Sequence, residues 1–275
     1  ESFPLIIPDY VNIEGEDEEY TILDGLDKVR IMNIQYVVEN TFSYFTITRG
    51  NGNDFENDAA DSGGAIIGWS SPIFSHVTFA NNYSDHGGAI KMDGSDAVFT
   101  DVTFINNEGH SMGGAVFIDN YSSPTFTDVL ISGNMAPGWA GGGVVIYDGS
   151  NPSFNNVIIR ENMASEGGGI SCHDSNATFN NVSITDNYAD YSGGVYLSEC
   201  DPIFNDVIIN GNESYSYGSG LSLFDESHPV LTNVTINYNI SNLGPAAIEI
   251  NDNSNPVFND VMINYNIGTG VYIED

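Results

Sequence analysis

Residues 99–107 read Phe-Thr-Asp-Val-Thr-Phe-Ile-Asn-Asn, and residues 113–116 read Gly-Gly-Ala-Val. These motifs recur along the chain at intervals of 23 to 28 residues. A pair of small residues followed by an aliphatic residue begins at Gly64, Gly88, Gly114, Gly142, Gly168, Gly193, Ser219, Ala246 and Thr269. A fixed period of this length indicates a repeat protein in which each unit buries its apolar face against its neighbours.

Three more positions recur in each repeat. The first holds Phe74, Phe99, Phe126, Phe154, Phe179, Phe204, Leu231 and Phe258. Three residues later stand Val77, Val102, Val129, Val157, Val182, Val207, Val234 and Val261. Five residues after each Val stand Asn82, Asn107, Asn134, Asn162, Asn187, Asn212, Asn239 and Asn266. We expect the Phe and Val columns to form the core and the Asn column to form a structural amide ladder in a left-handed turn.

The repeat predicts an all-β fold. Apolar residues alternate within each unit, as in Val129-x-Ile131 and Val157-x-Ile159, which is the period of a strand with one buried face. About 25 residues is too short for a propeller blade but sufficient for one coil of short parallel strands. We therefore predict a right-handed single-stranded parallel β-helix of about 9–10 coils, with equivalent residues stacked about 4.8 Å apart. Glycine pairs such as Gly87-Gly88 and Gly193-Gly194 fit corners where a Cβ would meet the next coil.

The domain organisation follows from the repeat. Residues 1–40 lack the glycine pair and are expected to form a capping coil, and residues 41–275 form one continuous repeat domain. The sequence stops within a strand pattern at residues 271–275, so we expect the natural chain to continue past Asp275.

The composition is strongly acidic. The 275 residues include 38 Asp and Glu but only five Lys and Arg, for a formal net charge of −33. This charge disfavours nucleic acid, anionic membrane surfaces and polyanionic substrates as partners. The sequence lacks a run of 18 apolar residues, so we do not expect membrane insertion. We expect the protein to be a monomer.

An acidic column is the first candidate site. Four residues after the aliphatic of the small-residue motif stand Asp148, Asp174, Glu199, Asp225 and Asp252, whereas Asp93 and Asp119 are displaced by one position. Carboxylates at about 4.8 Å repel by roughly 0.9 kcal/mol per pair in water. Oxygen ligands of this kind suit Ca²⁺, which is the cofactor we expect here. The alternative is a row of solvated turns whose repulsion is screened by salt.

A second candidate metal site is the long insertion at residues 51–61, which carries Asp54, Asp58 and Asp61. Its acid density suits a cation, but its spacing is not that of an EF-hand, so a surface bulge is the alternative.

Other residues give weaker signals. The five His residues occupy unrelated repeat positions, which disfavours a zinc site or a catalytic triad and predicts surface or turn residues. Cys172 should stack near Leu197, so a disulfide with Cys200 requires the segment after Leu197 to fold back. A lyase base is not evident among the five basic residues, and the uniform acidic column does not single out the two carboxylates of a hydrolase. The residue after each Val points outward, as in Thr78, Thr103 and Ile158. A flat face of Thr and aliphatic residues on a β-helix is also compatible with ice binding.

Two motif pairs resemble a known family. Residues 79–82 read Phe-Ala-Asn-Asn before Gly-Gly-Ala-Ile at 87–90, and residues 104–107 read Phe-Ile-Asn-Asn before Gly-Gly-Ala-Val at 113–116. These are similar to the repeats of the polymorphic outer-membrane protein family, a resemblance that implies a β-helical surface adhesin. The opening residues 5–25 resemble the first coil of pectate-lyase-like β-helix proteins. Later coils depart by placing Ile131, Ile159 and Ile184 where the motif has Phe, and the repeats define a scaffold without carrying over a catalytic residue.

From these observations we expect a secreted or cell-surface, non-catalytic β-helix that binds a polysaccharide or cell-surface glycan and is stabilised by Ca²⁺. The alternatives are a polysaccharide lyase or hydrolase with a groove along the helix and, third, an ice-binding protein.

Overall fold

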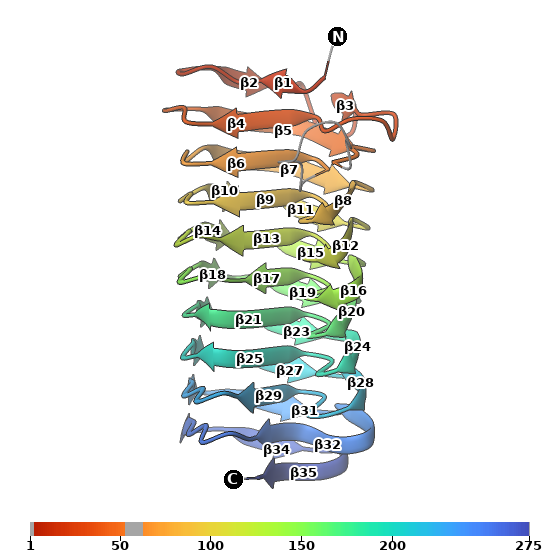
Figure 1. The fold of residues 1–275 in the computed structure, drawn as a ribbon, viewed down its shortest axis with the longest axis vertical. Coiled ribbons are helices and arrows are strands. Elements are labelled where there is room, and N and C mark those ends of the chain that lie inside the picture. The colour runs from red at the N-terminus through yellow and green to blue at the C-terminus, as the bar shows by residue number, and fades with distance from the viewer. Residues whose placement is uncertain (1–2, 53–62, 275) are drawn as a thin grey trace.

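The computed structural model describes residues 3–52 and 63–274. The chain winds into a stack of about ten coils, with the N-terminus at one end and the C-terminus at the other (Figure 1). The described residues contain strands, turns and bends but no helix. A typical coil has four short strands, which belong in pairs to two parallel sheets that we name sheet A and sheet B. The predicted all-β parallel coil architecture is confirmed.

Sheet B collects the strands that contain the Phe column and those that follow the Val column. The first series is β2 (Asn12–Glu14), β10 (Val98–Thr100), β14 (Thr125–Thr127), β18 (Ser153–Asn155), β22 (Thr178–Asn180), β26 (Ile203–Asn205), β30 (Val230–Thr232) and β33 (Val257–Asn259). The second series is β3 (Ile22–Asp24), β11 (Thr103–Ile105), β15 (Leu130–Ser132), β19 (Ile158–Arg160), β23 (Ser183–Thr185), β27 (Ile208–Asn210), β31 (Thr235–Asn237) and β34 (Met262–Asn264). Two longer strands span both positions, β5 (Thr41–Thr48) and β7 (Ile73–Ala80).

Sheet A collects the remaining two series. Before the small-residue pair lie β8 (Tyr83–His86), β12 (Glu108–Met112), β16 (Met135–Ala140), β20 (Met163–Glu166), β24 (Tyr188–Tyr191) and β28 (Glu213–Ser216). After it lie β4 (Met32–Gln35), β6 (Ala65–Gly68), β9 (Ile90–Asp93), β13 (Val116–Asp119), β17 (Val144–Ile146), β21 (Ile170–Ser175), β25 (Val195–Cys200) and β29 (Leu221–Phe224). The sheet also includes β1 (Leu5–Ile6), β32 (Ile240–Ile250) and β35 (Ile267–Ile273), and β1 pairs with β4.

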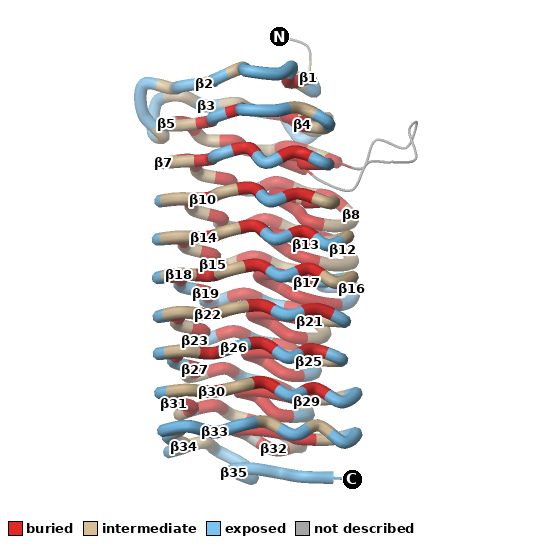
Figure 2. Tube along the Cα trace, turned by 90° about the vertical axis from the view of Figure 1, so that its left-hand side faces the viewer, coloured by how far each residue is buried: buried red, intermediate tan, exposed pale blue. Residues whose placement is uncertain are grey.

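The Phe column forms a stack of rings inside the coils. Consecutive rings from Phe74 to Phe204 have centroids 4.8–5.3 Å apart and are parallel to within 9°. The Val column lies beside it, and most members of both columns are buried (Figure 2). The stack is continued by Leu231 but ends at Phe258, which is 42% exposed. Burial of aromatic rings removes a large apolar area from water, so this column is a principal source of stability.

The Asn column forms the predicted amide ladder. In coil after coil the side-chain Nδ2 and the backbone N–H of one Asn both donate to Oδ1 of the next, as between Asn134 and Asn162 at 3.0 and 2.9 Å. The same Nδ2 also donates to a backbone carbonyl, that of Phe104 for Asn134. The left-handed residue is not the ladder Asn but its predecessor, for example Asn106 or Glu161, because the ladder Asn must turn its side chain inward.

A serine ladder, which the sequence analysis did not identify, runs along the opposite turn. The backbone N–H of each member donates to Oγ of the next, with distances of 3.0–3.4 Å for Ser70 to Ser95, Ser95 to Ser122, Ser122 to Ser150 and Ser150 to Ser175. The next position is Cys200, whose own N–H donates to Ser227 Oγ at 3.1 Å. Cys200 therefore replaces one serine of the ladder.

The two cysteines form a disulfide. Cys172 pairs in register with Leu197, as predicted, while Ser175 pairs with Cys200. The bridge forms because strand β25 continues to Cys200 and leads its side chain back into the core, where both cysteines are at most 1% exposed. The segment after Leu197 thus meets the condition that the sequence analysis set for a disulfide.

Glycines and left-handed residues build the corners of each coil. A Cβ on Gly88 or Gly194 would collide with the backbone of the following coil, which confirms the predicted reason for the glycine pair. Near the end of the last strand of each coil, either inside the strand or just after it, stands a left-handed residue with φ between 46° and 54°: Asp148, Asp174, Glu199, Asp225 and Asp252. The acidic column is therefore the apex of one row of turns.

Candidate functional site

The outer face of sheet A is a groove. Its floor consists of the strands from β9 to β29 that follow the small-residue pair, and its wall consists of the strands from β8 to β28 that precede it. The outward side chain of Phe117 on β13 is only 4% exposed because it packs against Ala140 of the wall and beside Met112. Val145, the register partner of Phe117 in the next coil, also faces outward and is fully buried, so the outer face of sheet A is concave here.

Aromatic and imidazole rings line this groove from coil to coil. We name them the aromatic strip: His86, Phe117, Tyr147, His173, Tyr196 and Phe224. Successive ring centroids are 5.3–6.5 Å apart. The wall adds Trp139, whose ring centroid lies 6.5 Å from that of His173, and Tyr217, which meets Phe224 edge to face at 5.3 Å. The strip runs along the axis of the solenoid.

A polar cluster lies at the middle of the strip. His173 Nε2 is 2.9 Å from Ser171 Oγ and 3.3 Å from Glu166 Oε1, and Ser171 Oγ also donates to Glu166 Oε1 at 3.2 Å. The side chains of His173 and Glu166 are 19% and 16% exposed. His173 is a partly exposed residue of the outer face, which agrees with the expectation of surface histidines, but the sequence did not predict its contacts with Glu166 and Ser171. Ser171 is fully buried, and Ser171 and Glu166 both contact Nε2 of His173 instead of lying on opposite nitrogens of the ring, so the cluster lacks the geometry of a serine nucleophile triad.

Two ionisable groups are perturbed on the outer face of sheet A, Tyr196 on the floor of the groove and Glu249 on β32 beyond it. Burial, reinforced by the carboxylates of Glu166 and Asp225, raises the pKa of Tyr196 far above its usual value. Burial likewise raises the pKa of Glu249, which is 4% exposed and whose Oε1 accepts a hydrogen bond from Asn251 at 2.9 Å. Tyr196, Ser222 and Glu249 are consecutive partners in the register of sheet A. The outer face of sheet A therefore keeps Tyr196 neutral and disfavours the charged form of Glu249.

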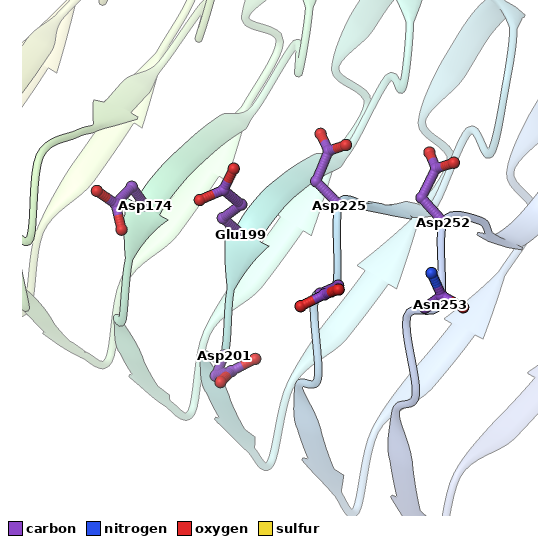
Figure 3. A pocket seen from close by; sticks show the side chains of 7 residues that line it. Asp174, Glu199, Asp201, Asp225, Asp252 and Asn253 are labelled. Atoms are coloured by element: carbon purple, nitrogen blue, oxygen red, sulfur yellow. The ribbon is translucent and has the colours of Figure 1, made fainter.

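The structure brings the five acidic-column residues into one row at the edge of the groove. Asp174, Glu199, Asp225 and Asp252 lie one per coil with their carboxylates on the same side (Figure 3). Together with Asp201, Glu226 and Asn253 they line an open hollow of about 600 Å³. Asp225 accepts a hydrogen bond from Ser198 Oγ at 2.7 Å. Among the described residues, the other four carboxylates of the column have no hydrogen-bonding partner, so they do not act as acceptors within their turns.

The acidic row is a set of separate carboxylates and not a preformed metal centre. Within residues 3–52 and 63–274, no group of three or more His, Cys, Asp or Glu side chains converges as metal ligands would. The second candidate set, Asp54, Asp58 and Asp61, lies outside the described residues. Calcium at either place remains a hypothesis.

The acidic row and the aromatic strip adjoin each other. A hollow of about 420 Å³ is lined by Tyr147, His173 and Ser198 from the floor and by Asp148, Asp174 and Glu199 from the turns. A ligand in this hollow would contact ring faces, a hydroxyl group and carboxylates at once. We name it the junction hollow.

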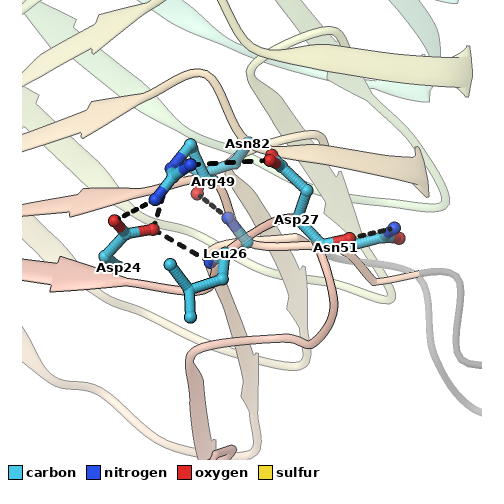
Figure 4. A network of polar contacts seen from close by, with 7 residues as sticks. Asp24, Leu26, Asp27, Arg49, Asn51 and Asn82 are labelled. Atoms are coloured by element: carbon cyan, nitrogen blue, oxygen red, sulfur yellow. Dashed lines mark hydrogen bonds and ion pairs between the residues drawn. The ribbon is translucent and has the colours of Figure 1, made fainter.

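The basic residues lie away from the junction hollow. Arg49 is bound at the N-terminal end, where Nε donates to Asp24 Oδ1 at 2.9 Å, Nη2 pairs with Asp24 Oδ2 and Nη1 lies 3.8 Å from Asp27 (Figure 4). This pairing lowers the pKa of Asp24. Lys91 lies over Phe117, with its Nζ 5.6 Å from the ring centroid. Beyond Arg160, on sheet B, the sequence contains neither Lys nor Arg. The C-terminal half of the groove thus lacks a fixed cation.

None of the described residues forms a helix with the length and apolarity needed to cross a membrane. The chain matches no curated protein. Among solved structures it is similar to the A-module of the mannuronan C-5 epimerase AlgE6 from Azotobacter vinelandii. The identity is 15% and the TM-score 0.44, over 98% of this chain and 85% of that one. The pattern of the right-handed β-helix region matches residues 19–170 and 114–275. Because these two matches together span nearly the whole sequence, the chain belongs to the right-handed β-helix family.

Proposed function

We propose that this protein is a secreted or cell-surface glycan-binding module that holds a polysaccharide chain along the outer face of sheet A. The observation that carries the proposal is the aromatic strip, which places one ring in each coil from His86 to Phe224 along the axis of the solenoid. Sugar rings have apolar faces that pack on aromatic side chains, while hydroxyl and carboxylate groups at the margin accept their hydrogen bonds. The resemblance to repeats of surface adhesins supports the same role.

An extracellular location is part of this proposal. The disulfide between Cys172 and Cys200 supports it, because structural disulfides persist mainly in oxidising compartments. We further propose that Ca²⁺ or another divalent cation stabilises the acidic row, whose solvent-facing carboxylates repel one another.

A second candidate function is a carbohydrate-active enzyme. One observation favours it: His173 lies within 3.3 Å of Glu166 in the groove, and Tyr147 and Tyr196 lie on either side of its ring. A histidine beside a carboxylate is a common general acid–base pair. The uniform acidic row, in contrast, is the arrangement of a binding surface, since it does not distinguish one pair of carboxylates.

One experiment separates these functions. The protein is screened on a glycan array, with and without Ca²⁺, and the same glycans are tested for new reducing ends and unsaturated sugars. Binding without product, abolished by Tyr147→Ala with Tyr196→Ala, is the result expected for a binding module. If products form with wild type and disappear with His173→Ala, the protein is a carbohydrate-active enzyme and not a binding module. Retained binding in the double tyrosine variant would contradict the placement of the glycan on the strip.

A further inference from the structure

The groove has an uneven distribution of charge that constrains its ligand. Towards its C-terminal half the floor presents Tyr147, His173 and Tyr196, and carboxylates lie on both sides of these rings. On the wall side, Glu166 is held 3.3 Å from His173 and accepts the hydroxyl of Ser171. On the turn side, Asp148, Asp174 and Glu199 line the junction hollow.

The neutral polar groups of the groove do not offset this charge. Ser198 donates its hydroxyl to Asp225, and the raised pKa of Tyr196 keeps its phenol uncharged. Lys91, the basic residue on the floor, belongs to β9, four coils before Tyr196 in the register of sheet A. A polyanionic chain lying on the strip would therefore meet carboxylates on both margins without a nearby cation to pair with.

We propose that the groove is specific for a glycan that carries free, protonated amino groups, with its sugar rings on the aromatic strip and its ammonium groups in the junction hollow and beside Glu166. This inference rests on the proposed glycan-binding function and names the class of glycan. Ammonium groups are attracted both by carboxylates and by the faces of aromatic rings. Tyr147 and His173 supply such faces in the junction hollow, where the carboxylates of Asp174 and Glu199 have no partner among the described residues.

The coil spacing supports a polymeric ligand. Equivalent residues repeat about every 4.8 Å along the axis, which is comparable to the advance of one β-1,4-linked hexose in an extended chain. Successive sugars in such a chain are turned by about half a turn, so alternate amino groups would face the acidic row and the others the side of Glu166, and the attraction would accumulate along the chain.

The test compares three soluble hexamers at low salt: β-1,4-linked glucosamine, its fully N-acetylated form and an oligouronate. We expect the amino hexamer to bind about tenfold more tightly than the acetylated one, the uronate not to bind, and the preference to shrink as salt is raised. If the acetylated hexamer binds equally well or better, or if the uronate binds best, the inference is wrong while glycan binding stands. If none of the hexamers binds but other glycans on the array do, the inference is again wrong. If no glycan binds at all, the proposed function fails with it.

Matched variants locate the effect. Asp174→Asn with Glu199→Gln should remove most of the amino preference, because it should weaken binding of the amino hexamer far more than binding of the acetylated one. Asp186→Asn with Asp260→Asn removes the same charge from exposed left-handed turns outside the groove and should alter neither affinity by more than about twofold. An equal loss in both variants would show non-specific charge attraction and overturn the inference. A control with poly-lysine tests the same point. If poly-lysine binds as tightly as the amino hexamer, and binds Tyr147→Leu as tightly as wild type, the inference is also overturned.

Discussion

Cys172 and Cys200 are joined by a disulfide although neither is the register partner of the other: Cys172 pairs with Leu197, and Cys200 pairs with Ser175. The disulfide lies where Cys200 occupies a position of the serine ladder, so the ladder has a sulfur atom there in place of a hydroxyl group. A covalent link between two coils therefore takes the place of the hydrogen bond that Ser175 N–H would otherwise donate to an Oγ in the next coil.

Removal of this disulfide should destabilise the fold. Closing a loop of 28 residues contributes roughly 3–4 kcal/mol in the chain-entropy treatment. Cys172→Ala with Cys200→Ala should therefore lower the melting temperature by about 10 °C. Cys172→Ala with Cys200→Ser should recover about 1 kcal/mol, because the hydroxyl oxygen introduced at the ladder position can accept the hydrogen bond of Ser175 N–H. Identical melting of the two variants would show that the ladder position adds no stability.

The Asn ladder should tolerate substitution poorly. Asn162 is 1% exposed, donates to Ile131 O and Asn187 Oδ1, and accepts two hydrogen bonds from Asn134. Asn162→Ala leaves several buried groups without partners, so we expect a loss of at least about 3 kcal/mol in denaturant unfolding. Asn255→Ala is the control: this exposed Asn is outside the ladder and not in a left-handed turn, and loss of its side chain should cost less than about 0.5 kcal/mol. Similar losses in both would mean that the ladder is not a special source of stability.

The acidic row should destabilise the protein at low salt when no cation is bound. Asp174 lies between Asp148 and Glu199, so Asp174→Asn removes two repulsive contacts and keeps a residue that tolerates the left-handed turn. We expect its melting temperature to rise by a few degrees at low salt and to match wild type at about 1 M salt. Asp260→Asn removes the same charge beside the uncharged Asn233 and should change the melting temperature less. A fall for Asp174→Asn would mean that its carboxylate is needed in the turn.

Calcium removal tests the cation hypothesis. If Ca²⁺ is present at about 100 times its dissociation constant, binding stabilises the fold by about 2.7 kcal/mol. A chelator should then lower the melting temperature by roughly 5–10 °C at low salt, and added Ca²⁺ should restore it. An unchanged melting temperature would rule out stabilisation by calcium. Asp174→Asn with Asp225→Asn should shrink the shift if the cation binds at the row.

Glu249 should make stability depend on pH in a defined direction. Its pKa is raised by burial, so the folded state holds a proton that the unfolded state releases. Stability from this group is fully present below the unfolded pKa and is lost as the pH rises through the folded pKa. Glu249→Gln should therefore be more stable than wild type at pH 7, with the difference fading towards pH 4. Glu14→Gln, an exposed control at the other end of the stack, should show little pH-dependent difference; a constant offset for Glu249→Gln would contradict the assignment.

Much of the fold could be predicted because the decisive residues recur at fixed offsets. The Phe and Asn columns are large or chemically distinctive, so eight copies of each are visible in the sequence. The serine ladder also recurs, since Ser122, Ser150 and Ser175 each precede a column Phe by four residues, but serine is common in this chain and Cys200 interrupts the series. Counting the serines that stand four residues before each column Phe could have revealed the serine ladder.

The groove could be predicted only in part. The acidic row follows from spacing, because all its members occupy the same corner. The cluster of Glu166, Ser171 and His173 joins two strands of one coil across the bend at the glycine pair, and the contact with Trp139 comes from the preceding coil. The degree of that bend depends on packing such as Phe117 against Ala140, which a one-dimensional pattern does not contain.

The Asn ladder also gives the solenoid an electrical direction. Every side-chain amide from Asn82 to Asn239 donates to the coil that follows and accepts from the coil before. The amide dipoles therefore add along the axis, with the carbonyl end at Asn82, which accepts Gly50 N–H, and the amino end at Asn266. The carbonyl end is closed inside the fold by Gly50 N–H, whereas Asn266 at the amino end is only half-buried. The two ends of the column therefore present different chemistry and are not interchangeable.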